Sequence, residues 1–261
     1  MENFPRTVGG RMLEYASFAG RLFLFWADAM GKCVTPRFYF AETIRQIYSI
    51  GVKSIILTST VSLSVGLVLA MLTIETLRIF GAVNYVSVIV GLGMVKELGP
   101  VLTGLMVAGR AGTGISAEVG AMKVTRQIDA LTVSAVNPMR YLVVTRIVAC
   151  MVAVPLLTII ADVLGILGGL AIGVLQGGIS YHLYVSYTLT YVGLTDVVPG
   201  LLKTIFFGML VGTVASYYGF ITTGGTEGVG NSTKSSFVTS ALLIMVSDVI
   251  LTRILLWIFG P

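Results

Sequence analysis

Residues 83–108 read VNYVSVIVGLGMVKELGPVLTGLMVA, an apolar run interrupted by only two charges, Lys96 and Glu97. A helix that crosses a bilayer needs about 20 consecutive, mainly apolar residues, so this segment is long enough to span. Four more segments meet the requirement, at 52–74, 142–175, 200–220 and 237–259. The sequence therefore predicts five transmembrane helices, of which the third is long enough to tilt, kink or leave the bilayer.

The composition excludes a soluble enzyme. Of the 261 residues, 56% are hydrophobic and 11% charged, whereas a soluble domain carries about a quarter charged residues. High hydrophobicity also excludes disorder, and long continuous apolar runs indicate helices rather than the alternating strands of a membrane barrel. The predicted fold class is an all-α integral membrane protein. It forms a single domain over 1–261, with an N-terminal segment 1–50 and a transmembrane bundle 51–261.

Basic residues orient the predicted spans. Seven lie before residue 54 and five lie in the 109–146 loop, whereas the loops at 75–82 and 176–199 contain only Arg78. Positive residues favour the cytoplasmic side, which places the N-terminus in the cytoplasm and, after five spans, the C-terminus on the far side. The pI near 9.3 thus reflects basic residues that mark cytoplasmic segments of a membrane protein. No nucleic-acid partner is therefore expected.

Residues 11–32 differ from the spans because they carry a charged face. The apolar face holds Tyr15, Phe18, Leu22, Phe25 and Trp26, and the other holds Glu14, Arg21 and Asp28. This pattern is typical of an interfacial helix that lies in the membrane plane. The alternative is a sixth, short span, which the three charges disfavour.

The adjacent charges of the second span point to a functional site. Lys96 and Glu97 project about 100° apart around a helix, so they do not pair with each other. Each costs several kcal/mol in hydrocarbon unless it faces a partner or water. Pro100 removes the backbone donor that would reach the Lys96 carbonyl, which favours a kinked helix lining a cavity. One alternative is a structural ion pair from this site to Asp162 or Asp248. These two carboxylates could also be proton carriers, or partners of Lys96, Lys203 or Arg253.

Glycines recur at helical spacing in the third and fourth spans. They stand at Gly165, Gly169, Gly173 and Gly177, and at Gly208 and Gly212. Small residues at such spacing let helices approach closely. The pattern fits either an intramolecular contact or a dimer interface.

The 109–146 loop contains a predicted amphipathic helix at 114–136. Its stripe consists of Ala117, Ala121, Val124, Ile128, Leu131 and Ala135. Such a cytoplasmic helix is either a docking surface for a partner or a lid packed on the bundle.

No catalytic or metal-binding constellation is visible in the sequence. The segment 225–232 resembles a phosphate-binding loop but has Asn231 at the lysine position, so it is interpreted as a glycine-rich loop. Cys33 and Cys150 give no disulfide framework, and His182 is the single histidine. The chain is therefore predicted not to be an enzyme and to bind no metal or cofactor. Energy for active transport would come from a partner or an ion gradient.

Four motifs occur in order within residues 97–131: ELGP at 97–100, AGRAG at 108–112, AEVGAM at 117–122 and RQIDAL at 126–131. This run closely resembles the signature of the MlaE permease family, the membrane subunits of Mce-associated lipid ABC transporters. A weaker resemblance extends from about Arg45 to the last span.

The resemblance implies a set of partners in a bacterial inner membrane. The permease is expected to form a homodimer of five-span subunits, each with an N-terminal interfacial helix. A cytoplasmic ABC ATPase would hold ATP and Mg, a periplasmic Mce-domain protein would face the other side, and some complexes add a STAS-domain subunit. Phospholipid would occupy a cavity between the two permeases.

The resemblance also implies site residues. Those expected at the lipid cavity are Lys96, Glu97, Leu98, Leu69, Leu77, Phe80 and Asp248. Those expected to contact the ATPase are Glu118, Met122, Arg126, Gln127, Asp129 and Leu131. The chain departs from the family pattern at Arg126, Asn137 and Thr145, where glutamate, aspartate and proline are usual, and at Phe80, where some relatives have tyrosine.

The favoured hypothesis is the permease subunit of an ATP-driven phospholipid transporter that helps maintain outer-membrane lipid asymmetry. A second hypothesis is an ion-coupled secondary transporter or channel that uses Lys96, Glu97 and Asp248 directly. A third is a non-transporting subunit that anchors partners. The sequence leaves transport direction, headgroup preference, acyl-chain preference and partner stoichiometry open.

Overall fold

The computed structural model describes residues 4–33 and 39–260, and all regular elements in this part are helices. The α-helices are α1 (Phe4–Cys33), α2 (Phe40–Gly51), α3 (Ile55–Ile79), α4 (Val86–Gly93), α5 (Gly99–Val107), α6 (Thr113–Val124), α7 (Gln127–Val133), α8 (Thr145–Leu175), α9 (Tyr181–Tyr191), α10 (Leu194–Phe220) and α11 (Gly225–Phe259). Short turns join them: the 3₁₀ turns η1 (Val52–Ser54) and η2 (Val83–Tyr85), and the π-turns η3 (Met94–Leu98), η4 (Ala108–Gly112) and η5 (Met139–Val144).

Five helical runs in the described part are long and apolar enough to cross a membrane, as predicted. They are Phe40–Ile79, Val83–Val124, Met139–Leu175, Leu194–Phe220 and Gly225–Phe259. Three begin well before the predicted spans or extend beyond them, because polar helical turns continue each run past its apolar centre. The interpretation of 225–232 as a loop was wrong, because these residues form the first turns of α11.

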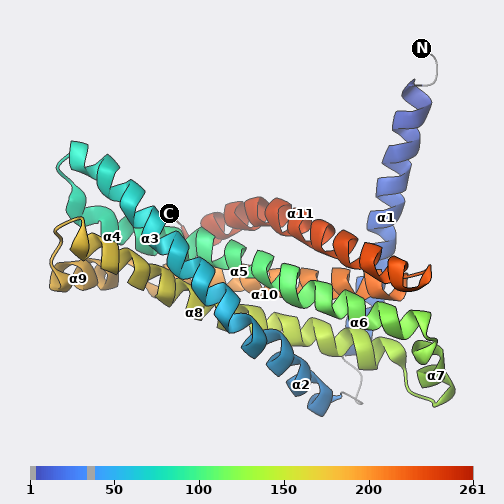
Figure 1. The fold of residues 1–261 in the computed structure, drawn as a ribbon. Coiled ribbons are helices and arrows are strands. Elements are labelled where there is room, and N and C mark those ends of the chain that lie inside the picture. Colours follow the sequence, from blue (N-terminus) through green and yellow to red (C-terminus); the bar gives the residue numbers. More distant parts are fainter. Residues whose placement is uncertain (1–3, 34–38, 261) are drawn as a thin grey trace.

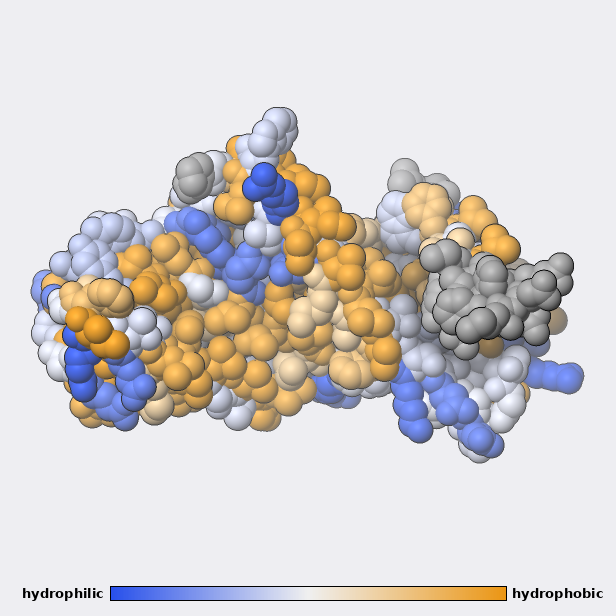
Figure 2. Space-filling view, turned by 90° about the horizontal axis from the view of Figure 1, so that it is seen from above, coloured by the Kyte–Doolittle hydropathy of each residue, from blue (hydrophilic) through white to orange (hydrophobic). Residues whose placement is uncertain are grey.

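The five runs lie roughly along one direction, with α8 packed between α3 and α10, and α11 packed on α10 and α6 (Figure 1). Apolar residues cover most of the middle of the face in Figure 2, apart from a hydrophilic patch in its upper middle, and further hydrophilic residues gather toward its two ends. An apolar band between two polar ends is the surface expected of a bilayer-spanning bundle.

Helix α1 runs across the bundle rather than along it, near the end where α6 and α7 lie (Figure 1). The predicted apolar face is the one that packs: Phe18 and Phe25 contact Tyr217 with ring centroids 5.8 and 5.4 Å apart. Ala29 is fully buried against the start of α8. The side chains of Tyr15 and Glu14 lie outside the described part. Because α1 is not among the spanning helices, a sixth span is not supported.

The glycine repeats serve contacts within the chain. A Cβ on Gly165 would overlap the side chain of Met94, and one on Gly173 would come within 2.9 Å of the Tyr184 ring. On α10, a Cβ on Gly208 would lie 2.5 Å from the Cys150 carbonyl oxygen of α8. Absence of a side chain at these points lets α8 approach its neighbours, since helix association in lipid depends on close packing.

The predicted helix at 114–136 is in fact two helices, α6 and α7, and α6 continues the second spanning run. The break occurs at Arg126, whose φ of 59° lies in the left-handed region. The predicted stripe is not one continuous buried face: Ile128 is buried, whereas Ala121 and Ala135 are exposed. The left-handed backbone at Arg126 ends α6 and lets α7 begin in a new direction. The periodicity of apolar residues along a sequence carries no signal for such a break.

We expect Arg126→Gly to raise the stability of the protein by about 0.5–1 kcal/mol. A left-handed L-residue costs about 1–2 kcal/mol, and glycine removes this cost at a smaller entropic penalty. Thermal unfolding in detergent measures the change. Ala130→Gly, in the regular part of α7, is the control and should lower stability by about 1 kcal/mol; equal effects of the two changes would contradict the argument.

Candidate functional site

The π-turn η3 places both intramembrane charges at a break in the second run. Pro100 has no backbone N–H, so the normal helical donor to the Lys96 carbonyl is missing. The ammonium of Lys203, on α10, takes that place: its Nζ lies 3.1 Å from the Lys96 carbonyl oxygen. The same Nζ lies 2.8 Å from Glu97 Oε2. Pro100, which was predicted to weaken the helix, therefore leaves the Lys96 carbonyl oxygen free to accept a hydrogen bond from the buried ammonium of Lys203.

Lys203 is the centre of the site, and its side chain is only 3% exposed. An ammonium has three donors, and all three are engaged, by the Lys96 carbonyl, by Glu97 and by the hydroxyl of Thr252 at 2.5 Å. Thr252 in turn donates to Glu97 Oε1 at 3.0 Å. Asp248 Oδ1 lies 3.1 Å from the same Nζ and forms an ion pair with it.

The second charge of the π-turn has a separate partner. Lys96 Nζ lies 2.8 Å from Asp196 Oδ1, and the other oxygen of Asp196 accepts from the backbone N–H of Gly193 at 3.0 Å. Asp196 thus closes the N-terminus of α10 and holds Lys96 with one carboxylate. As predicted, Lys96 and Glu97 do not pair with each other.

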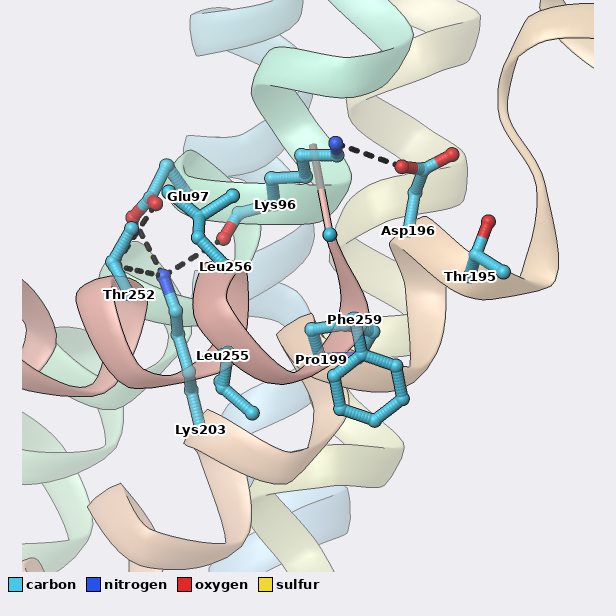
Figure 3. A pocket seen from close by; sticks show the side chains of 11 residues that line it. Lys96, Glu97, Thr195, Asp196, Pro199, Lys203, Thr252, Leu255, Leu256 and Phe259 are labelled. Atoms are coloured by element: carbon cyan, nitrogen blue, oxygen red, sulfur yellow. Dashed lines mark hydrogen bonds and ion pairs between the residues drawn. The ribbon is translucent and has the colours of Figure 1, made fainter.

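A cavity of about 230 Å³ lies beside these ion pairs (Figure 3). Its polar wall is formed by Lys96, Glu97, Thr195, Asp196, Lys203 and Thr252, and its apolar wall by Pro199, Leu255, Leu256 and Phe259, with Gly260 at the end of the chain. In Figure 3, Lys203 points toward Glu97 and Thr252, with Leu255 beside its stem, whereas Phe259 and Pro199 lie further along the cavity. Such a two-sided lining suits a ligand with a polar and an apolar part.

The two lone carboxylates have different surroundings. Asp248 belongs to the Lys203 cluster, so of the alternatives considered for it the structure shows a lysine partner. Asp162 is 7% exposed, and its Oδ1 has no hydrogen-bond partner in the described part of the chain. It packs against Gly99, where a Cβ would overlap its carboxylate. Asp162 therefore does not pair with Lys96.

The apolar residues expected at the lipid cavity do not line this cavity. Leu69 and Leu98 line a separate apolar groove of about 290 Å³ on α3. Leu77 packs against the buried cluster around Ile74, and Phe80 is 75% exposed at the end of α3. The structure brings Lys96, Glu97 and Asp248 together, but it places these four residues elsewhere.

The predicted coupling residues form a surface at one end of the bundle. Arg126, Gln127 and Asp129 are exposed, whereas Met122 and Leu131 pack against the core. Glu118 Oε1 lies 3.0 Å from Arg146 Nη2, and the Arg146 side chain is only 2% exposed. This ion pair fixes α6 to the base of α8.

Three residues of the site escaped the sequence-based prediction of lipid contacts. Lys203 had a usable signal, because a lysine in an apolar span usually faces a partner or a cavity. Thr252 and Asp196 had none, because hydroxyls are common in membrane helices and Asp196 lies near a predicted helix end. Their roles depend on which helices are neighbours.

We expect Thr252→Val to destabilise the protein although it keeps the shape of the side chain. The change leaves Glu97 Oε1 without its donor, at about 1–3 kcal/mol for a buried group, whereas the freed ammonium donor can turn to Asp248 Oδ1. The midpoint of thermal unfolding in detergent measures the loss. Thr252→Ser keeps the hydroxyl and should stay near wild type; an equal loss in both variants would show that the hydroxyl is not the cause.

Spanning helices that enclose a charge-lined, two-sided cavity define a polytopic membrane protein of the permease class. Residues 43–254 match the family described as Permease MlaE. The chain belongs to the MlaE permease family.

Individual relatives agree over nearly the whole chain. It is 35% identical to a probable ABC transporter permease protein of Rickettsia typhi, covering 97% of this chain and 98% of the relative. It is 31% identical to the intermembrane phospholipid transport system permease protein MlaE of Haemophilus influenzae, with 97% of each chain covered. A probable ABC transporter permease protein of Synechocystis is 34% identical over 81% of this chain and 80% of the relative.

Proposed function

We propose that this chain is the permease subunit of an ATP-driven transporter that moves phospholipid between a bacterial inner membrane and a periplasmic Mce-domain partner. The observation that carries the proposal is the cavity beside Lys203, where an ionic wall faces an apolar wall. A phospholipid has a charged headgroup and apolar chains, so it complements both walls. The name of the Haemophilus relative, which refers to phospholipid transport, supports the same substrate class.

The energy source would be a separate ABC ATPase that binds ATP and Mg. The exposed residues around Arg126, together with the Glu118–Arg146 ion pair, form the surface on which such an ATPase would act. The distribution of basic residues supports a cytoplasmic location for this surface, with the C-terminus in the periplasm. Transport by this assembly would help maintain outer-membrane lipid asymmetry.

The proposal includes a homodimer. Helix α11 borders the cavity, yet it exposes a row of aliphatic side chains that include Leu242 (63% exposed), Val246 (60%) and Val249 (70%). A second copy seated on this face would close the cavity between two permeases. Some assemblies would also carry a STAS-domain subunit.

Purification from native membranes in mild detergent, with mass spectrometry of proteins and lipids, tests the proposal. We expect an ABC ATPase, an Mce-domain protein and bound phospholipid to accompany the chain. Recovery of the chain without an ATPase or lipid, together with ion flux that persists without ATP, would instead support the ion-coupled alternative. A complex that forms normally but moves no lipid would support the anchoring alternative.

A further inference from the structure

Both lysines at the cavity are already paired with carboxylates. Two lysines, Lys96 and Lys203, stand against three carboxylates, Glu97, Asp196 and Asp248. The formal balance of this cluster is therefore one negative charge. Lys203 has spent its donors and Lys96 already neutralises Asp196, so a headgroup that is only negative would face this surplus of negative charge.

A further cation lies immediately beside the cluster. Arg253 follows Thr252 in α11, is exposed, and makes no ion pair with any residue in 4–33 or 39–260. It lines an open groove of about 550 Å³ together with Ile254, Leu256 and Trp257. Leu256 also lines the charged cavity, so the groove and the cavity adjoin along this one helix.

The position of Arg253 requires an explanation. It lies within a helix apolar enough to span the membrane, where an unpaired guanidinium is costly unless it finds an anion or water. A guanidinium binds a phosphate through two parallel N–H donors, a geometry that a lysine cannot reproduce. Trp257 stands one helical turn further along α11, so its ring borders the same groove and can cover the glycerol part of a lipid.

We infer that Arg253 binds the phosphate of the transported lipid, and that the ammonium of its headgroup faces Glu97. This rests on the proposed function and names its preferred substrate class, a zwitterionic aminophospholipid. The two charges of a phosphoethanolamine headgroup match the two features of the site: a guanidinium in the groove with no ion pair in the described ranges, and a net negative charge in the cavity. Glu97 is 41% exposed, so its carboxylate is accessible to such a group.

The test uses the full chain with whatever partners co-purify, exchanged into mixed micelles that contain equal amounts of phosphatidylethanolamine and phosphatidylglycerol. Mass spectrometry measures the phospholipid retained per protein and the ratio of the two lipids. We expect the wild type to favour phosphatidylethanolamine. Arg253→Gln should retain about tenfold less phospholipid, as expected for the loss of one charge-assisted contact, and Arg253→Lys should recover part of it.

Arg45→Gln is the matched control, since the Arg45 side chain is 81% exposed on α2, away from the cavity. It should retain lipid like the wild type. Unchanged lipid and an unchanged ratio in Arg253→Gln would overturn the inference and leave Arg253 as an interfacial anchor. A wild-type preference for phosphatidylglycerol would overturn the headgroup assignment. No phospholipid on the wild type at all would instead overturn the proposed function, which keeps the two failures distinct.

Discussion

Lys203→Met is expected to abolish lipid transport and to lower the stability of the protein by about 3–5 kcal/mol, the cost of removing one partner from a buried ion pair. Methionine matches the length of the lysine stem but has no donors. The Lys96 carbonyl, Glu97 Oε2 and Thr252 would lose their shared donor at once. Asp248 would lose the cation 3.1 Å from its carboxylate. ATP-driven lipid transfer in proteoliposomes and thermal unfolding in detergent measure the two effects.

A double variant separates the ion pair from the packing. Adding Glu97→Gln to Lys203→Met removes the most closely bound carboxylate charge, so it should restore part of the lost stability without restoring transport. Lys234→Met is the control, because Lys234 is exposed near the start of α11, and it should unfold like the wild type. Normal stability and transport in Lys203→Met would show that the cluster is not needed.

Gly66→Ala is the second change for which we expect a large effect, although it adds a single methyl group. A Cβ at Gly66 on α3 would overlap the carbonyl oxygen of Gly165 on α8, and this backbone atom cannot rotate away. Overpacking of this kind costs about 1–3 kcal/mol. Because α3 and α8 make the most extensive helix contact in the described part, we expect the upper end of this range.

Gly230→Ala provides the matched control for this prediction. Gly230 also lies inside a helix, but a Cβ there would meet no atom within 4 Å. Alanine is favoured over glycine in a helix by about 1 kcal/mol, so this variant should be as stable as the wild type or more stable. Thermal unfolding in one detergent compares both variants, and a loss for Gly230→Ala equal to that for Gly66→Ala would refute the steric explanation.

Much of the fold followed from the sequence because the hydrophobic length of a span is a local property. The five spans were predicted correctly, and the apolar face of α1 is the one that packs on α10. The ends of the spans were less accurate. Polar turns such as 225–232 continue a helix into the aqueous phase, where hydropathy no longer distinguishes a helix from a loop.

The candidate site was only partly predictable. Charge at mid-span next to Pro100 indicated a cavity correctly, since proline chemistry and the cost of charge in lipid depend on the residues themselves. The expected aliphatic wall of Leu69 and Leu98 lies in a separate groove. The apolar wall of the cavity comes instead from the end of α11, at Leu255, Leu256 and Phe259.

The sequence by itself determined the membrane class, the number of spans and the place of the helix break in the second run. Each depends on side-chain hydrophobicity or on proline, which act over one or two helical turns. Only the tertiary structure decided that Lys203 fills the freed carbonyl, that Thr252 bridges it to Glu97, and that Asp162 lies apart from them. These partnerships arise from which helix faces meet, and contacts such as that between Gly66 and Gly165 determine this through close packing over the whole bundle.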